Sequence, residues 1–203
     1  MTMTEAIQER LRQTAAVCER LAAESADAIA RAADILVAAL RAGRTIYLCG
    51  DGGSAAQAQH TAGELVGRFL VDRPALPAVA LTTDTSVLTA VANDYSFEQV
   101  FERQVEALVK EGDVLVALST SGSSTNVLKA ASLARKRGAR VVGLTGAGGG
   151  KLRELCDECL AVPADSSPLI QEAHLAVLHV LCARVEQAVF TQSDEQAPPK
   201  PKE

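Results

Sequence analysis

Three histidines, one glutamate and one glutamine have the types and spacing that suit acid–base or metal chemistry. His60 and Glu64 are four residues apart in a helical pattern, which places an imidazole and a carboxylate one turn apart on one face. Gln171, His174 and His179 fall in an otherwise aliphatic helical segment, where a polar side chain costs free energy unless it is paired or used. Each histidine alone could be an ordinary hydrogen-bonded residue, but the set indicates a functional site.

A loop rich in hydroxyl groups follows the apolar run Val114 to Leu118. It contains Ser119, Thr120, Ser121 and Ser124, whose hydroxyls can donate to phosphate oxygens. A helix pattern follows, and the free N–H groups and dipole at a helix start favour an anion. Because the loop lacks a GK[ST] ending and the spaced glycines of a dinucleotide fingerprint, we expect a small phosphorylated ligand. The alternative is that these hydroxyls only cap a helix.

The segment Asp51, Gly52, Gly53 and Ser54 repeats this order of strand, small-residue loop and helix, directly after the apolar run Thr45 to Cys49. Open parallel sheets bind ligands beyond the carboxyl ends of their strands. We therefore expect the two loops to lie at the same edge of one sheet.

The segments that position these loops alternate between strand and helix patterns. Short apolar runs predict strands at 45–49, 78–81, 114–118, 140–145 and 159–162. Helical patterns lie at 55–69, 82–91, 97–110, 126–136, 152–155 and 171–189. Asn93 and Asp94 predict a turn. The alternation indicates an α/β fold, a doubly wound parallel sheet of about five strands.

A helical extension of about residues 1–42 precedes the first strand. Its apolar residues follow one face from Ile7 to Leu21 and another from Ile29 to Leu40, with Ser25 as the predicted break and N-cap. A helix detached from a sheet must bury its apolar stripe elsewhere. We therefore expect this extension to form an oligomer interface.

Composition argues against several classes of protein. With 203 residues we expect one domain over 1–190, and the polar, proline-rich 191–203 to be disordered. A net charge of −5 without a basic run argues against nucleic-acid binding. Without a signal peptide or a long apolar span, we expect a cytoplasmic protein with no membrane partner. Cys156 and Cys159 have CxxC spacing but no second pair, so we predict reduced thiols and no cysteine zinc site.

Five segments of the chain resemble the sugar isomerase (SIS) domain family and, within it, the phosphoheptose isomerases. They are CGDGGS (49–54), AQHTAGELVGRF (58–69), AVAND (90–94), LSTSGSSTNV (118–127) and IQEAHLAVLH (170–179). The likeness runs from the N-terminal helices to about Phe190. It implies an aldose–ketose isomerase that converts sedoheptulose 7-phosphate to D-glycero-D-manno-heptose 7-phosphate through an enediol.

The resemblance also implies a role for each matching residue. The sugar phosphate would be held by Ser119, Thr120, Ser121 and Ser124. The sugar would be contacted by Asp51, Gly52, Gly53, Ser54, Asn93, Asp94 and Gln171. Glu64 would be the base and His179 the acid. Zinc, one ion per subunit and optional, would bind to His60, Glu64, Gln171 and His179. The family's members are homotetramers with active sites between subunits.

Two features of the implied zinc set stay open. One carboxylate cannot be a tightly held ligand and a free base at the same instant, so either the metal leaves an oxygen of Glu64 free or the site works without metal. Gln171 and His179 are eight residues apart, about 12 Å along a helix. His174, one turn from Gln171, is the rival ligand on spacing alone.

Three departures from the family pattern bear on substrate detail. Asp51 stands where Asn is usual, Ala55 stands where some members have His, and residues 164–169 lack the usual Asp-Arg or Ala-Arg. Two alternatives come from the same superfamily. One is a non-enzymatic regulator that binds the bacterial replication initiator, and the other is an isomerase or binding protein for another phosphosugar. The presence of both Glu64 and His179 favours the isomerase over the regulator.

Overall fold

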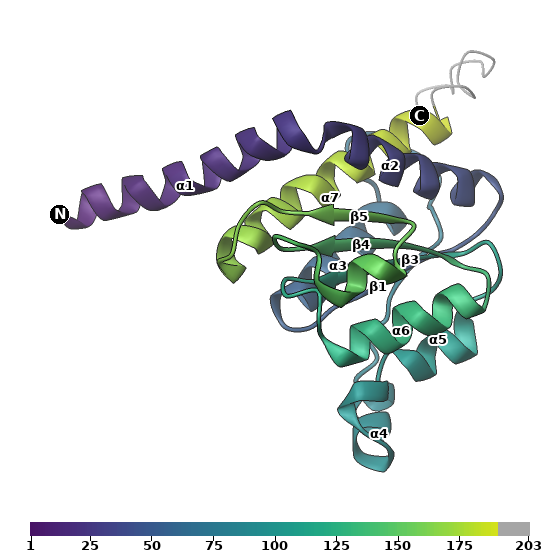
Figure 1. The fold of residues 1–203 in the computed structure, drawn as a ribbon. Helices are drawn as coiled ribbons and strands as arrows, with labels where there is room; N and C mark the ends of the chain where they lie inside the picture. The colour runs from purple at the N-terminus through teal and green to yellow at the C-terminus, as the bar shows by residue number, and fades with distance from the viewer. Residues whose placement is uncertain (191–203) are drawn as a thin grey trace, which may run out of the picture.

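Short, largely apolar runs form the strands of one parallel sheet in the computed structural model, which describes residues 1–190 (Figure 1). The strands are β1 (Ile46–Cys49), β2 (Ala78–Ala80), β3 (Val114–Ser119), β4 (Arg140–Thr145) and β5 (Glu158–Ala161). Their order is β2-β1-β3-β4-β5, and all neighbours are parallel. The predicted α/β fold with a parallel sheet is confirmed.

Helices cover both faces of the sheet. The first four are α1 (Met3–Glu24), α2 (Ala26–Arg41), α3 (Gly53–Val66) and α4 (Thr85–Asp94). They are followed by η1 (Phe97–Gln99), α5 (Glu102–Leu108), α6 (Thr125–Lys136), η2 (Gly150–Leu155) and α7 (Ser167–Phe190). One core lies between the sheet and α2, α3 and α7, and a second lies between the sheet and α5, α6 and η2.

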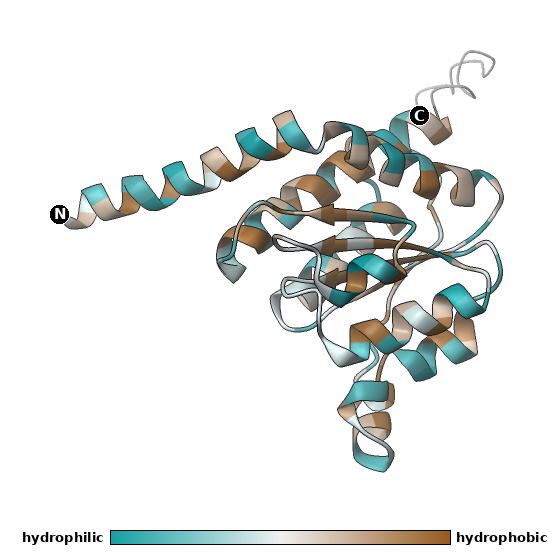
Figure 2. Cartoon of the chain, in the orientation of Figure 1, coloured by the Kyte–Doolittle hydropathy of each residue, from teal (hydrophilic) through white to brown (hydrophobic). Residues whose placement is uncertain are grey.

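The central strand β3 is buried on both faces because its side chains alternate between these two cores. Val114, Val116 and Leu118 belong to the core under α2, α3 and α7, whereas Leu115 and Ala117 belong to the core under α5 and α6. Figure 2 shows the sheet as a mostly hydrophobic layer between the helices. The end of β3 is therefore held rigidly at the point where the serine-rich loop begins.

The long helix α7 packs against α1, α2 and α3. Among the described residues, it alone is long and apolar enough to cross a membrane by those two criteria, which the core helix of a globular protein also meets. Leu178, Leu181 and Val185 are each at most 1% exposed in the core. Its apolar body is thus explained by packing under the sheet.

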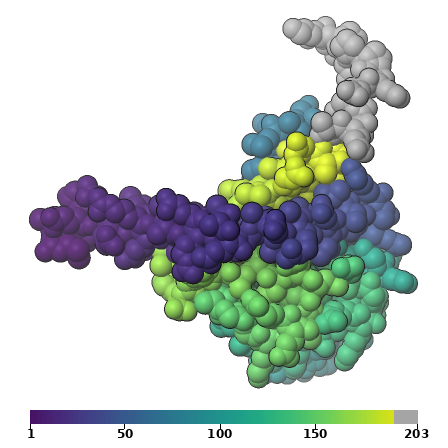
Figure 3. Space-filling model, turned by 45° about the horizontal axis from the view of Figure 1, so that its top comes forward, coloured from purple at the N-terminus to yellow at the C-terminus, as the bar shows by residue number. Residues whose placement is uncertain are grey.

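The helix α1 extends away from the body of the molecule (Figures 1 and 3). Val17 and Leu21 are buried near its carboxyl end, but Ile7 and Leu11 are 54% and 66% exposed. The predicted break at Ser25 is present, although the Ser25 side chain makes no capping hydrogen bond to α2. The amino-terminal half of the apolar stripe has no partner within the described chain.

Three local predictions were wrong. Asn93 and Asp94 do not form a turn, because they are the last residues of α4. The side chain of Asp84 accepts a hydrogen bond from the Val87 N–H, so this helix starts and ends later than its apolar pattern suggested. The predicted helix over 97–110 is divided into η1 and α5.

Candidate active site

Two small-residue loops meet where β1 and β3 end side by side. Cys49 of β1 and Ala117 of β3 are register partners, so the chain leaves both strands at the same edge. The loops are joined by a hydrogen bond of 2.7 Å from Asn126 Nδ2 to Asp51 Oδ1. Asn126 is 3% exposed and was not among the predicted site residues. The signal that could have found it is its place, a polar residue in the first turn of α6.

Three hydroxyl groups of the serine-rich loop turn toward one another. Ser119 Oγ lies 3.0 Å from Ser124 Oγ and 3.5 Å from Ser121 Oγ. Ser124 is the N-cap residue of α6, yet its side chain makes no capping hydrogen bond. Helix capping therefore does not explain the Ser124 hydroxyl. The three hydroxyls form a cluster of donors at the amino-terminal end of a helix, an arrangement that suits an anion.

The loop is fixed from behind by the connection that follows β4. Gly146 N donates to the carbonyl of Thr120, and Leu152 N donates to the carbonyl of Gly122. Gly122 has φ +63°, and a Cβ there would lie 2.1 Å from the carbonyl oxygen of Gly149. Only glycine fits such a position. The glycine-rich stretch after β4 thus shapes the candidate phosphate site.

Gln171 belongs with these loops. A Cβ at Gly53 would lie 2.7 Å from Gln171 Nε2, so the amide group rests on the backbone of the first loop. Gln57 Nε2 donates to the carbonyl oxygen of Gln171 at 2.6 Å, which ties α3 to α7. Gly52, with φ +56°, is the N-cap residue of α3, and Ser54 in the first turn of that helix is buried.

His60, Glu64 and His179 form a second group further along the same two helices. His60 Nε2 lies 2.8 Å from His179 Nε2 and 3.4 Å from Glu64 Oε1. One imidazole must donate and the other accept in such a pair. The ring of Phe69 stacks on His179 with the ring centres 5.4 Å apart. His60 therefore connects the predicted base to the predicted acid, a place that its spacing alone did not reveal.

These three side chains have the donor types that zinc prefers, but their arrangement is that of a hydrogen-bonded pair. Two nitrogens that bind one tetrahedral zinc ion lie roughly 3.3 Å apart, so His60 and His179 would have to separate slightly to share an ion. Over residues 1–190, no group of three His, Cys, Asp or Glu side chains is arranged to hold a metal. Gln171 lies on α7 eight residues before His179, and its side chain and backbone contact Gly53 and Gln57 instead.

His174, the rival zinc ligand on spacing, is turned into the core. It is fully buried, and its Nε2 lies 3.0 Å from the carbonyl oxygen of Thr145. A carbonyl only accepts, so Nε2 carries the proton, and Nδ1 has no hydrogen-bond partner in the described part of the chain. Burial lowers the pKa of His174 to about 4. His174 therefore lies under the end of β4 and not beside His60.

Asn93 and Asp94 lie apart from both groups in this chain. Both are exposed at the end of α4, which projects from the body of the molecule (Figure 1). Asn93 Nδ2 donates to Asp94 Oδ1, so its amide is engaged with its neighbour. Their predicted contact with the sugar stays a prediction.

Comparisons with known proteins agree with one another. The SIS domain family matches residues 11–146. The chain is 58% identical to the phosphoheptose isomerase of Rhodospirillum rubrum, over 87% of this chain and 94% of that protein. It is 52% identical to the phosphoheptose isomerase of Geobacter metallireducens, over 93% of this chain and all of that protein.

A solved structure of a similar protein has the same fold. The phosphoheptose isomerase of Neisseria gonorrhoeae is 39% identical and matches with a TM-score of 0.87, over 92% of this chain and all of that one. The fold, the paired loops and these identities lead to one assignment. The chain belongs to the SIS-domain family and, within it, to the phosphoheptose isomerases.

Proposed function

We propose that this protein is an aldose–ketose isomerase that converts sedoheptulose 7-phosphate to D-glycero-D-manno-heptose 7-phosphate through an enediol. The observation that carries the proposal is the convergence of Glu64, His60 and His179: His60 Nε2 lies 3.4 Å from Glu64 Oε1 and 2.8 Å from His179 Nε2. Curated relatives with about half or more of their residues identical bear the name phosphoheptose isomerase.

The isomerisation moves a proton between C1 and C2, and it therefore needs a base for the carbon proton and an acid for the oxygens. Glu64 is the proposed base, because a carboxylate can take a proton. The imidazole of His60, one helical turn away, can orient that carboxylate. His179 is the proposed acid. His60 hydrogen bonds to His179 and lies beside Glu64, so it can hold a proton between the two groups.

The phosphate would be bound by the cluster of Ser119, Thr120, Ser121 and Ser124. Hydroxyl hydrogens and the amino-terminal end of α6 together favour a dianion. Asp51 adds a negative charge close by, but Asn126 Nδ2 donates to its carboxylate, which fixes that carboxylate within the loop. The sugar hydroxyls would contact Asp51, the backbone of Gly52 and Gly53, Ser54 and the amide of Gln171.

Zinc is proposed as an optional cofactor that His60, Glu64 and His179 would hold once the two imidazoles move apart, because imidazole nitrogen and carboxylate oxygen suit this ion. When bound there, zinc would supply Lewis-acid polarisation of the substrate carbonyl. Gln171 would join this set only after a movement that breaks its contact with Gly53. The histidine pair itself can orient the proton-transfer groups.

We propose a homotetramer whose active sites lie between subunits. Large apolar side chains flank the acid–base group and are at least 47% exposed, namely Val66, Leu70, Val71 and Val180. Such patches are typical of interaction surfaces, and the amino-terminal half of α1 adds another. A partner subunit could also bring its Asn93 and Asp94 to the sugar.

A cytoplasmic location without a nucleic-acid or membrane partner is part of the proposal. The net charge of −5 disfavours phosphate-backbone binding. All five cysteines are free thiols, as expected in a reducing compartment.

The direct test is turnover of sedoheptulose 7-phosphate by the purified full chain, followed by NMR of the anomeric region. We expect the aldoheptose phosphate to form, and parallel arms with added zinc and with a chelator measure the contribution of metal. Zinc binding is measured separately by calorimetry on metal-free protein. No turnover in any arm by a folded oligomer would refute the isomerase proposal and would favour a different phosphosugar or the regulator.

A further inference from the structure

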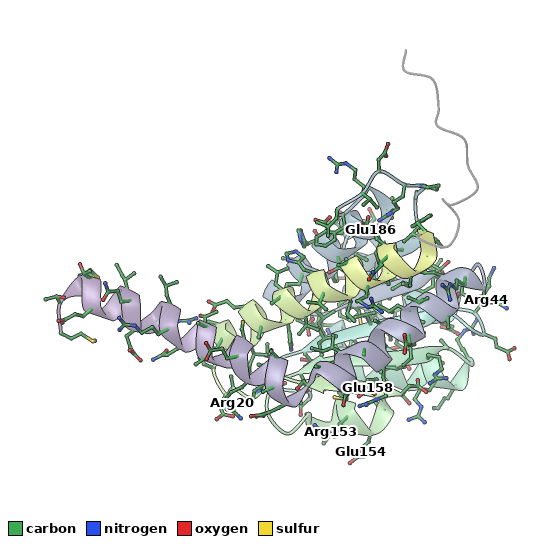
Figure 4. All side chains as sticks on the ribbon, turned by 90° about the horizontal axis from the view of Figure 1, so that it is seen from above. Arg20, Arg44, Arg153, Glu154, Glu158 and Glu186 are labelled. Atoms are coloured by element: carbon green, nitrogen blue, oxygen red, sulfur yellow. The ribbon has the colours of Figure 1, made fainter. Side chains whose placement is uncertain are left out.

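Glu186 is a charged residue in the core that the proposed chemistry does not use. It lies on α7, near the end of the helix (Figure 4), and its side chain is 3% exposed. A buried carboxylate is costly unless it is paired and hydrogen-bonded. This one accepts three backbone hydrogen bonds, from the N–H groups of Phe69 and Leu70 at 2.8 Å and of Val71 at 3.3 Å.

The fourth partner of this carboxylate is an arginine that is equally buried. Arg73 Nε donates to Glu186 Oε1 at 2.9 Å, and the Arg73 side chain is 2% exposed. Its remaining N–H groups donate to carbonyl oxygens at the end of α3, that of Leu65 at 2.6 Å and that of Glu64 at 2.7 Å. The last carbonyls of a helix need partners from outside the helix, and Arg73 supplies them.

The ion pair thus joins the two helices that carry the acid–base group. Arg73 holds the backbone of Glu64 itself, while Glu186 is two turns after His179 on the same face of α7. Glu186 also accepts a hydrogen bond from the backbone N–H of Phe69, whose ring stacks on His179. In contrast to the buried ion pair, the His60 side chain is 43% exposed. The reacting groups therefore lie at the surface, and their positions depend on the buried residues that pack behind them.

Stability alone does not account for this arrangement. A buried ion pair stabilises a fold little better than apolar residues of the same volume, because removing two charges from water offsets their attraction. Burial acts to raise the pKa of Glu186, but the hydrogen bonds from Phe69, Leu70, Arg73 and Val71 outweigh it and lower that pKa. The carboxylate therefore stays charged and keeps its four hydrogen bonds at neutral pH.

We propose that Arg73 and Glu186 are positioning residues of the isomerase, which hold Phe69 against His179 and the end of α3 against α7 so that Glu64 and His179 keep a reactive geometry. This inference rests on the proposed function for its kinetic part. Its structural part, the placement of the His179 ring by Phe69, can be measured without turnover.

Two variants and one matched control test the proposal. Phe69→Leu removes the stacking ring but leaves the ion pair, and Glu186→Gln removes the charge at nearly constant volume. The control is Asp113→Asn, at the opposite end of β3. The Asp113 carboxylate is also buried, and it accepts backbone hydrogen bonds from Thr45 at 2.9 Å and Lys110 at 2.8 Å.

We expect Phe69→Leu and Glu186→Gln to lower kcat by about 10- to 100-fold with KM changed less than about twofold, since small displacements of reacting groups have effects of this size. Asp113→Asn should lower the melting temperature but leave kcat within about twofold of wild type. With histidine-selective isotope labelling, the chain's three histidines give few imidazole NMR signals. Those of His179 should shift in both test variants and not in the control.

The proposal is overturned if folded Phe69→Leu keeps both the wild-type kcat and the wild-type His179 signals. It is also overturned if Asp113→Asn loses as much kcat as Glu186→Gln, because the loss would then reflect general destabilisation. If Glu186→Gln does not fold, Phe69→Leu still decides the matter. Absence of turnover in the wild type would instead refute the proposed function, and the NMR comparison would still test the placement of His179.

Discussion

The buried imidazole of His174 predicts that this protein loses stability in mild acid. Burial lowers the pKa of His174 from its ordinary 6.5 to about 4. The unfolded chain therefore binds a proton at this site at a higher pH than the folded chain does. Stability falls as the pH drops below about 6.5, and the loss is complete near pH 4.

The size of the effect follows from the two pKa values. At 1.36 kcal/mol per pKa unit, the full loss is about 3 kcal/mol, and at pH 5 it is about 2 kcal/mol. The surroundings of the ring explain why protonation of His174 is unfavourable in the folded protein. Its Nε2–H donates to the carbonyl oxygen of Thr145, and among the described residues a second proton on Nδ1 would find no hydrogen-bond acceptor.

The assay is urea unfolding at pH 7.5, 6.0 and 5.0 at one protein concentration, for wild type and His174→Gln. Glutamine keeps a donor for the Thr145 carbonyl but does not titrate. The pKa of Glu186 is lowered in the folded protein, so its protonation in acid also lowers the free energy of unfolding. That loss is equal in both proteins. We expect wild type to lose about 2 kcal/mol more than the variant between pH 7.5 and 5. Equal losses would refute the reasoning.

Three further predictions concern the loops and the thiols. Gly122→Ala should lower the melting temperature and raise KM, because its Cβ would collide with the Gly149 carbonyl, as kinetics and thermal melts would show. Ser124→Ala should raise KM more than it lowers kcat in steady-state assays, because it removes a proposed phosphate donor; an unchanged KM would contradict this. The neighbouring Cys156 thiol lowers the pKa of Cys159, so Cys159 should carry more thiolate at pH 7.5 than it would without that neighbour. Mass spectrometry should find it alkylated by iodoacetamide fastest of the five thiols, and Cys156→Ser should slow that reaction.

The strands were the most predictable part of this fold. The predicted bounds of β4, 140–145, are those observed, because a buried apolar run lies between two glycines that end it, Gly138 and Gly146. The start of α7 was predicted four residues too late, at Gln171 instead of Ser167. Proline at position 168 falls in the first turn of α7, where a missing N–H costs nothing.

The end of α3 could not be predicted from local sequence. The helical pattern continued to about Phe69, but the helix ends at Val66 because the Phe69 N–H donates to Glu186, a residue 117 positions later in the chain. Arg73 likewise takes the carbonyls of that helix end. These contacts depend on tertiary structure, which periodicity does not report.

The candidate site was predictable to the extent that it lies in short motifs. The loops and the pair His60 and Glu64 were placed correctly on a strand end and one helix face. The contact between His60 and His179, and the hydrogen bond from Asn126 to Asp51, required the register of α3 against α7 and of β1 against β3. The separation of Gln171 from His179 followed from helix geometry alone.

Glu64 and His179 are the residues proposed to carry out proton transfer on a phosphorylated seven-carbon sugar. The most direct measurement is the single-turnover conversion of sedoheptulose 7-phosphate by wild type, Glu64→Gln and His179→Ala. Glu158→Gln is the control variant, because the Glu158 carboxylate pairs with Arg31 and not with a residue of the candidate site. We predict product from wild type and from the control, and none from folded Glu64→Gln or His179→Ala within the same time. Conversion by Glu64→Gln at the wild-type rate would contradict the account.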